Sequence, residues 1–144
     1  MKALALSRSD APVVVDTDVV SFLFNNHSLA SAYQAILGVR PMAVSLIAMA
    51  EIEYGMEKRN WGIGRRNLMR RFLDRFTPLL PDTGTAVLWA RVKSDCERNG
   101  RPITFADAWI AAAALQLDVP LVTHNARDFG AGENLTILTS SAAK

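Results

Sequence analysis

The chain has 144 residues, half of them hydrophobic, and a formal net charge of +2 from 16 basic and 14 acidic side chains. This composition predicts one domain with an ordinary core and excludes a fold stapled by disulfides or zinc, since Cys96 is the only cysteine. We expect an N-terminal extension at residues 1–11, too short for a signal peptide or a membrane span, and a single domain at residues 12–140. A lone cysteine suits a reducing compartment, so the protein is predicted to be cytoplasmic and not to bind membranes.

Apolar runs alternate with helical patterns along the whole chain. The first run has three consecutive valines after Pro12, a pattern typical of a strand buried on both faces of a parallel sheet. In chain order we predict a strand at 13–16, a helix at 19–24, a second helix that ends at residue 37 and has Asn26 or Ser28 as its N-terminal cap, and a strand at 42–45. Helices at 46–58 and 63–75 follow, and then an edge strand at 76–80. The last elements are helices at 84–98 and 106–117 and strands at 119–123 and 135–138. This alternation predicts a three-layer α/β fold, a mostly parallel sheet with helices on both faces.

Two carboxylates stand at the carboxyl end of the first predicted strand. Asp16 and Asp18 are separated only by Thr17. Ligands of open α/β sheets bind beyond the carboxyl ends of the strands, so Asp16 is expected to face a crevice and not the core.

Asp107 lies in a segment that is otherwise apolar from residue 105 to 115. A helix that is apolar all round is buried, and a buried carboxylate is unfavourable unless it is paired, hydrogen-bonded or bound to a metal. The spacing from Thr104 to Asp107 is also that of a capping box, in which the acid only completes the helix start. Both interpretations place the carboxylate at the rim of the domain.

Glu51 and Glu53 are candidates for a third acidic ligand. On a helical wheel they flank the apolar stripe on opposite sides, so only one of them can face a given site, and the wheel alone does not choose. Together with Asp16 and Asp107, either glutamate would supply the carboxylate oxygens that Mg²⁺ or Mn²⁺ prefers. Hydrolysis of a phosphodiester is the reaction that such a site suggests.

Basic side chains are concentrated between residues 58 and 75. Seven of them stand against one acid, Asp74: Lys58, Arg59, Arg65, Arg66, Arg70, Arg71 and Arg75. The segment is either a solvated helix face opposite an apolar stripe or a flank that binds phosphate. A pair such as Arg66 and Arg70 would belong to that flank in the second interpretation.

Four motifs occur in the order seen in PIN domains, and the chain most resembles the toxin ribonucleases of the VapC type. They are Val15-Asp16-Thr17-Asp18, Ala50-Glu51-Ile52 with Gly55, Asp107 with Ile110-Ala111-Ala112, and residues 122–129. The resemblance covers residues 13–138. It implies a Mg²⁺-dependent endoribonuclease that acts on RNA, is silenced by a cognate antitoxin and forms a homodimer.

The resemblance also implies which acids form the site. By position, Asp16 and Asp107 hold the metal and Glu51, not Glu53, completes the cluster. Many family members have a fourth acid where this chain has Asn125, and Asp128, three residues later, is the candidate substitute.

Three further side chains have positions next to these acids. Asp18 stands where asparagine is common in the family and adds negative charge. Thr17 and Thr123 are expected to orient the carboxylates from a second layer. His27 and His124 are predicted to be surface turn residues and not general bases.

Two alternatives have different chemistry. In a haloacid dehalogenase-like phosphatase, Asp16 would be the nucleophile, Asp18 the general acid and Ser45 the second motif, but the paired acids expected after a later strand are absent. In an inactive PIN-like module, the chain would bind RNA or protein without cleavage.

Overall fold

The structure is a computed structural model that describes residues 10–130 and 134–140. Most of the predicted extension at 1–11 therefore lies outside the described residues. The elements are β1 (Val13–Val15), α1 (Thr17–Phe24), α2 (Ala30–Leu37), β2 (Met42–Ser45), α3 (Leu46–Lys58), α4 (Ile63–Leu73), β3 (Thr77–Leu79), α5 (Thr83–Arg98), α6 (Phe105–Leu117), β4 (Leu121–Val122), a 3₁₀ turn η1 (Ala126–Phe129) and β5 (Ile137–Leu138).

The five strands form one sheet in the order β3-β2-β1-β4-β5. Every neighbouring pair is parallel, and β1 is central, with Val14 in register with Ala43 of β2 on one side and Leu121 of β4 on the other. All three valines of β1 are fully buried, as expected for a strand paired on both edges. The predicted α/β fold with a parallel sheet is confirmed.

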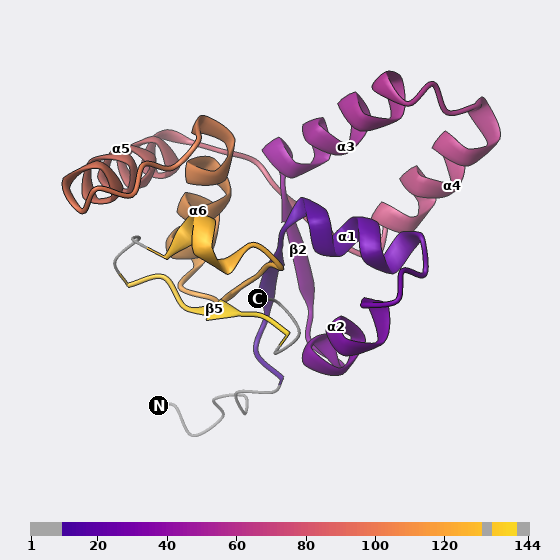
Figure 1. The fold of residues 1–144 in the computed structure, drawn as a ribbon, viewed down its shortest axis with the longest axis horizontal. Coiled ribbons are helices and arrows are strands. Elements are labelled where there is room, and N and C mark those ends of the chain that lie inside the picture. Colours follow the sequence, from indigo (N-terminus) through magenta and orange to yellow (C-terminus); the bar gives the residue numbers. More distant parts are fainter. Residues whose placement is uncertain (1–9, 131–133, 141–144) are drawn as a thin grey trace.

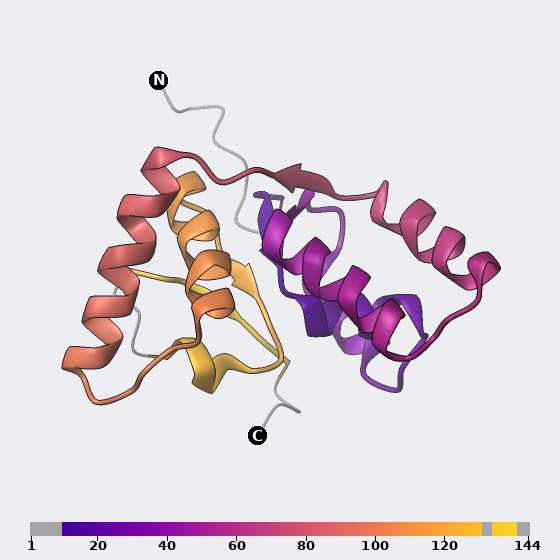
Figure 2. The ribbon, with the colours of Figure 1, turned by 90° about the horizontal axis from the view of Figure 1, so that it is seen from above.

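Helices cover both faces of the sheet. The chain moves outward from β1 to β3 and then returns past β1 to β4, so right-handed crossovers place α1–α4 on one face and α5 and α6 on the other (Figures 1 and 2). The order of the strands reverses at β1 and β4, and the carboxyl ends at such a switch point are where α/β sheets bind ligands.

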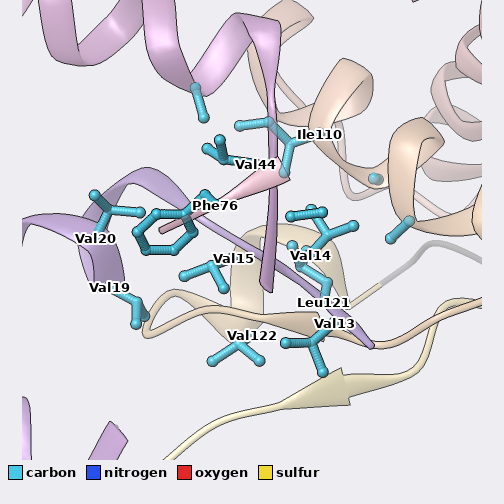
Figure 3. Packing of buried hydrophobic residues seen from close by; sticks show 14 of the residues in the cluster. Val13, Val14, Val15, Val19, Val20, Val44, Phe76, Ile110, Leu121 and Val122 are labelled. Carbon is cyan, nitrogen blue, oxygen red and sulfur yellow. The ribbon is translucent and has the colours of Figure 1, made fainter. Parts of the chain in front are cut away.

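The core is built from small and β-branched side chains. Valines of β1, α1 and β2 meet Phe76, Ile110 and the two residues of β4 (Figure 3). The run of alanines in α6 is almost fully buried, and α6 packs against β1, β2, α3 and α5. Within the described part of the chain, no helix is both long and apolar enough to cross a membrane.

The structure moves several predicted boundaries because of local capping. Helix α1 begins at Thr17, earlier than residue 19, since the Asp16 side chain caps it. The predicted cap of the second helix is wrong: α2 has no side-chain cap at Leu29, Asn26 has a positive φ of 51°, and the His27 ring accepts the Leu29 N–H. Strand β4 is shorter than residues 119–123.

Strand β3 lies at one margin of the sheet, as predicted. It contains Pro78, which is in register with Val44 of β2. Proline has no N–H to donate, so sheets accept it only at their edges. The edge position of this strand is therefore confirmed.

Tyr33 of α2 is fully buried and joins three segments that are distant in sequence. Its hydroxyl contacts His124 Nδ1 at 2.6 Å and Thr139 Oγ1 at 3.3 Å, and it accepts the Ser140 N–H at 3.2 Å. The Phe22 ring packs edge-on against His124. The prediction of His124 as a surface turn residue is wrong, because the ring is half-buried and hydrogen-bonded, whereas His27 is exposed.

We predict that Tyr33→Phe lowers the free energy of unfolding by about 1–3 kcal/mol, because it removes the hydroxyl that contacts His124 Nδ1 and Thr139 Oγ1 inside the fold. Chemical denaturation followed by circular dichroism measures this loss. Tyr54→Phe is the matched control, since Tyr54 is 65% exposed and should tolerate the change. Equal stability of the two variants would contradict the role given to the Tyr33 hydroxyl.

Candidate active site

A cavity of about 430 Å³ lies at the carboxyl ends of β1 and β4 and is lined with acids from several elements. Five carboxylates line it, those of Asp16, Asp18, Glu51, Asp107 and Asp128. The other lining residues are Thr17, Ser21, Phe22, Arg59, Asn125 and Phe129. The structure therefore brings together all the acids that the sequence singled out except Glu53.

Asp16 is the most buried of these acids, with 5% of its surface exposed. Its Oδ1 accepts the Thr17 N–H at 2.8 Å, and its Oδ2 accepts the Thr123 hydroxyl at 2.7 Å. Burial, and then repulsion from Asp18 and Glu51, raises the pKa of Asp16 to about 6, although both hydrogen bonds act to lower it. The carboxylate is thus oriented by two donors but lacks a compensating positive charge.

Asp107 faces the same cavity from the first turn of α6. The Thr104 hydroxyl caps the helix by accepting the Asp107 N–H at 3.1 Å. Burial is the main cause that raises the pKa of Asp107 to about 6, followed by repulsion from Asp16; Glu51 and Asp128 add to it. Capping and site formation are therefore compatible, because the backbone is capped while the carboxylate meets other acids.

The structure separates Glu51 from Glu53. Glu51 Oε1 accepts the Thr17 hydroxyl at 2.7 Å at the cavity wall. Glu53 points to α4 instead and accepts two hydrogen bonds from Arg70, at 2.9 and 2.7 Å, which lower the pKa of its carboxyl. Only Glu51 is placed to act with Asp16.

The loop after β4 offers two candidates for the fourth position. The Asn125 side chain donates to Asp18 Oδ2 at 2.9 Å, and its N–H donates to Thr123. Asp18 also accepts the His124 N–H at 3.1 Å, so Asp18 and Asn125 together hold this loop against α1. Burial raises the pKa of Asp18 despite these bonds.

Asp128 is exposed, and within the described residues its carboxylate has no hydrogen-bond or ion-pair partner. It is close enough to Asp107 to raise the pKa of that carboxyl. Of the two candidates, Asp128 is the free acid, and Asn125 is engaged by Asp18.

The donor chemistry of the cavity fits a hard divalent cation. Burial, and after it repulsion among the acids, raises the pKa of Asp16 and Asp107, and a bound cation would stabilise their charged forms. In the described ranges, no three His, Cys, Asp or Glu side chains lie close enough to enclose a metal. Mg²⁺ does not require such a cage, because it keeps several waters and is usually held by one or two carboxylates and substrate phosphate.

The arginines proposed as a phosphate-binding pair have partners inside the protein. Arg66 pairs with Glu57 at 2.6 Å and donates to the Trp61 carbonyl, and Arg70 is bonded to Glu53. These contacts fasten α4 to α3. The structure favours the interpretation of this face as a packed and solvated helix surface over a phosphate-binding flank at Arg66 and Arg70.

Sequence reasoning counted Arg59 in the basic segment but not as a site residue, and it is the cation that the described residues contribute to the cavity lining. Glu51, Gly55 and Arg59 follow one another at intervals of four, which places them on one helical face, so the spacing could have revealed it. A Cβ atom at Gly55 would lie only 2.7 Å from Arg59 Nη1. The absence of a side chain at Gly55 therefore leaves room for the guanidinium.

The raised pKa values of Asp16 and Asp107 predict that, without metal, their ionised carboxylates lower the free energy of unfolding above about pH 6. Asp16 and Asp107 have folded-state pKa values near 6 against 3.8 ordinarily, so between these values the folded chain binds more protons than the unfolded chain. Their contribution to the free energy of unfolding therefore falls as the pH rises through this window, and the loss persists above it. In EDTA at pH 7.5, Asp107→Asn should raise the melting temperature by roughly 3 °C.

Differential scanning fluorimetry from pH 4 to 8 measures this effect. The difference between Asp107→Asn and the unchanged chain should shrink toward pH 4. Asp74→Asn is the matched control, because Asp74 is exposed and should show no such pH-dependent difference. A lower melting temperature for Asp107→Asn at pH 7.5 would contradict the prediction.

Comparisons with known proteins identify the family to which the chain belongs. The chain is 26% identical over 116 residues to the tRNA(fMet)-specific endonuclease VapC of Shigella flexneri and 28% identical over 116 residues to ribonuclease VapC2 of Haemophilus influenzae, each match covering 81% of this chain and 88% of the relative. Its fold matches a chain in the structure of VapBC2 from Rickettsia felis bound to a promoter DNA fragment, with a TM-score of 0.78 at 22% identity, over 89% of this chain and 98% of that one. The family model of the PIN domain matches residues 13–131, and the chain belongs to the PIN domain family.

Proposed function

We propose that this protein is a divalent-metal-dependent endoribonuclease, the toxin of a type II toxin-antitoxin pair, and that it hydrolyses RNA phosphodiester bonds. The observation that carries the proposal is the meeting of Asp16, Glu51 and Asp107, from three separate elements, on one cavity at the switch point of the sheet. Relatives named ribonuclease and tRNA endonuclease support the substrate class. RNA as substrate places its action in the cytoplasm.

In this proposal the acids have distinct roles. Asp16 and Asp107 hold Mg²⁺ or Mn²⁺, Glu51 completes the cluster, and Asp128 is the fourth acid. The cation supplies an activated water and neutralises negative charge on the phosphate. Its affinity rests on carboxylates that are already crowded in the folded chain.

The polar neighbours position these acids and the loop. Thr17 holds Glu51 and Thr123 holds Asp16, each through a hydrogen bond of 2.7 Å. Such second-layer donors keep a ligand in the orientation that the metal needs. Asp18 and Asn125 act on the loop that carries Asp128.

A cognate antitoxin and a second copy of the chain are the proposed protein partners. Solved structures similar in fold include toxin-antitoxin complexes from Klebsiella pneumoniae and Salmonella typhimurium, which supports the first. Several large apolar side chains are exposed and could contact either partner: Tyr54, Ile63, Leu68, Leu80 and Phe105.

The two alternatives have less support. A phosphatase of the haloacid dehalogenase type has paired acids after a later strand, but Thr123, His124 and Asn125 follow β4 here. Ser45, its proposed second motif, is buried and caps α3 by accepting the N–H groups of Ile47 and Ala48. An inactive module has no need of unpaired acids around one cavity.

We predict that Asp16→Asn and Asp107→Asn each reduce RNA cleavage to the level seen in EDTA, because each removes ligand charge without removing volume. The assay incubates purified protein with total bacterial RNA and Mg²⁺ and maps new 5′ ends by sequencing. Asp74→Asn is the control for an isosteric change at an exposed acid and should cleave normally. Full activity of either site variant would refute the shared-metal site.

The toxin role predicts growth arrest in cells. Induced expression of the unchanged chain should stop growth, and expression of Asp16→Asn at equal protein level should not. Colony counts after induction measure the difference. Arrest by both chains would separate toxicity from the acidic site.

A further inference from the structure

A second hollow adjoins the acidic cavity and has a different chemical character. This groove, of about 440 Å³, is lined by α1, α3 and α4 and shares Thr17, Ser21, Glu51 and Arg59 with the cavity. Beyond them its lining includes Lys58, Arg65 and Trp61. The two hollows therefore lie side by side, and Arg59 lines both of them.

The groove carries positive charge that is available to a ligand. Both Lys58 and Arg59 are exposed, and no hydrogen bond or ion pair to the side chain of either is found among the described residues. The other cations of this surface are engaged: Arg66 and Arg70 pair with glutamates, and Arg65 lies over the Trp61 ring and donates to Asn25. Within the described part of the chain, Arg59 is thus an arginine without a partner that lines both the groove and the acidic cavity.

The position of Arg59 depends on Gly55. Both follow Glu51 on one face of α3, and the guanidinium occupies the space that a Cβ at Gly55 would need. Glycine within a helix is destabilising relative to alanine. The helix therefore contains a destabilising residue at the point that Arg59 Nη1 approaches.

We propose that Arg59 binds the phosphate next to the scissile one, so that the RNA strand runs from the acidic cavity into the groove between α1, α3 and α4. This inference rests on the proposed function, because it assigns a path to the same substrate. The scissile phosphate would contact the cation held by the acids. The next phosphate along the RNA strand would then contact the guanidinium of Arg59, which has no partner among the described residues. Arg59 is a positioning residue that contacts the substrate away from the reacting atoms.

Charge favours RNA over a protein segment as the occupant. The groove adjoins the acids that are proposed to act on RNA, and Lys58 and Arg59 give it positive charge that has no partner among the described residues. Contacts to phosphate are independent of sequence, so the inference can be tested without knowing the target.

The first test measures binding without cleavage. Fluorescence anisotropy with a random-sequence 12-nucleotide single-stranded RNA is recorded for Asp107→Asn, alone and combined with Arg59→Ala, Arg59→Lys or Arg91→Ala, across a series of salt concentrations. Arg59→Ala should weaken binding about tenfold and reduce the salt slope by about 0.7, the value for one phosphate contact on a single strand. Arg59→Lys should restore the slope, and Arg91→Ala, which removes an exposed arginine from α5, should change neither quantity.

The second test separates positioning from chemistry. On an RNA fragment with a mapped cut, Arg59→Ala should raise KM about tenfold and leave kcat nearly unchanged, the signature of lost binding to a part of the substrate that does not react. A fall in kcat at constant KM would overturn the inference, as would unchanged KM and salt slope. A loss of antitoxin binding with RNA binding intact would also overturn it and assign the groove to the antitoxin.

Gly55→Ala tests the placement independently, because the new methyl group pushes the guanidinium aside while favouring the helix. The variant should melt no lower than the unchanged chain and still bind the RNA more weakly. Normal RNA binding by this variant would contradict the placement of Arg59. Failure of the unchanged chain to cleave any RNA would refute the proposed function, whereas failure of the Arg59 variants alone would refute only the strand path.

Discussion

The hydrogen bond from the Thr123 hydroxyl to the buried Asp16 carboxylate joins the ends of β1 and β4, between which the cavity opens. Both residues directly follow strands that pair with each other in the centre of the sheet, so the core fixes the position of this hydrogen bond. The same hydroxyl accepts the Asn125 N–H, and Asn125 in turn reaches Asp18. These hydrogen bonds thus connect the sheet to the loop that carries Asp128 and fix the position of that loop.

A second series of contacts connects the loop after β4 to α2 and α1. Tyr33 holds His124 through its hydroxyl, and the backbone of His124 donates to Asp18. The fold therefore places neutral donors around the acids and almost no cations among them. Such an arrangement keeps the acids ordered but leaves their charge uncompensated, which is the property that makes the cavity attractive to a divalent ion and unfavourable without one.

The sequence alone could predict the parts of this structure that depend on local pattern. Three consecutive valines before Asp16 predicted the central strand, and Pro78 predicted an edge. The choice between Glu51 and Glu53 needed more, because a helical wheel gives two faces but not the neighbour that each face meets. Only the packing of α1 beside α3 brings Thr17 to Glu51.

The basic segment shows why a local count of charges is insufficient. The partners of Arg66 and Arg70 are Glu57 and Glu53, which precede the basic residues in sequence and lie on the preceding helix. These glutamates neutralise the two arginines only because α4 packs against α3 in the folded chain. Arg59, by contrast, was hidden by its place in that same basic run, although its spacing from Glu51 was informative.

Pro78 also has a consequence for how copies of this protein can associate. A parallel sheet with an open margin can grow by accepting a strand from another molecule, which leads to fibres and aggregates. On strand β3 the chain has proline at the middle of a three-residue strand, so it offers an incoming strand few donors and little length. Open-ended growth by addition of strands at β3 is therefore disfavoured, and contacts between copies on this side of the molecule are left mainly to side chains of the helices.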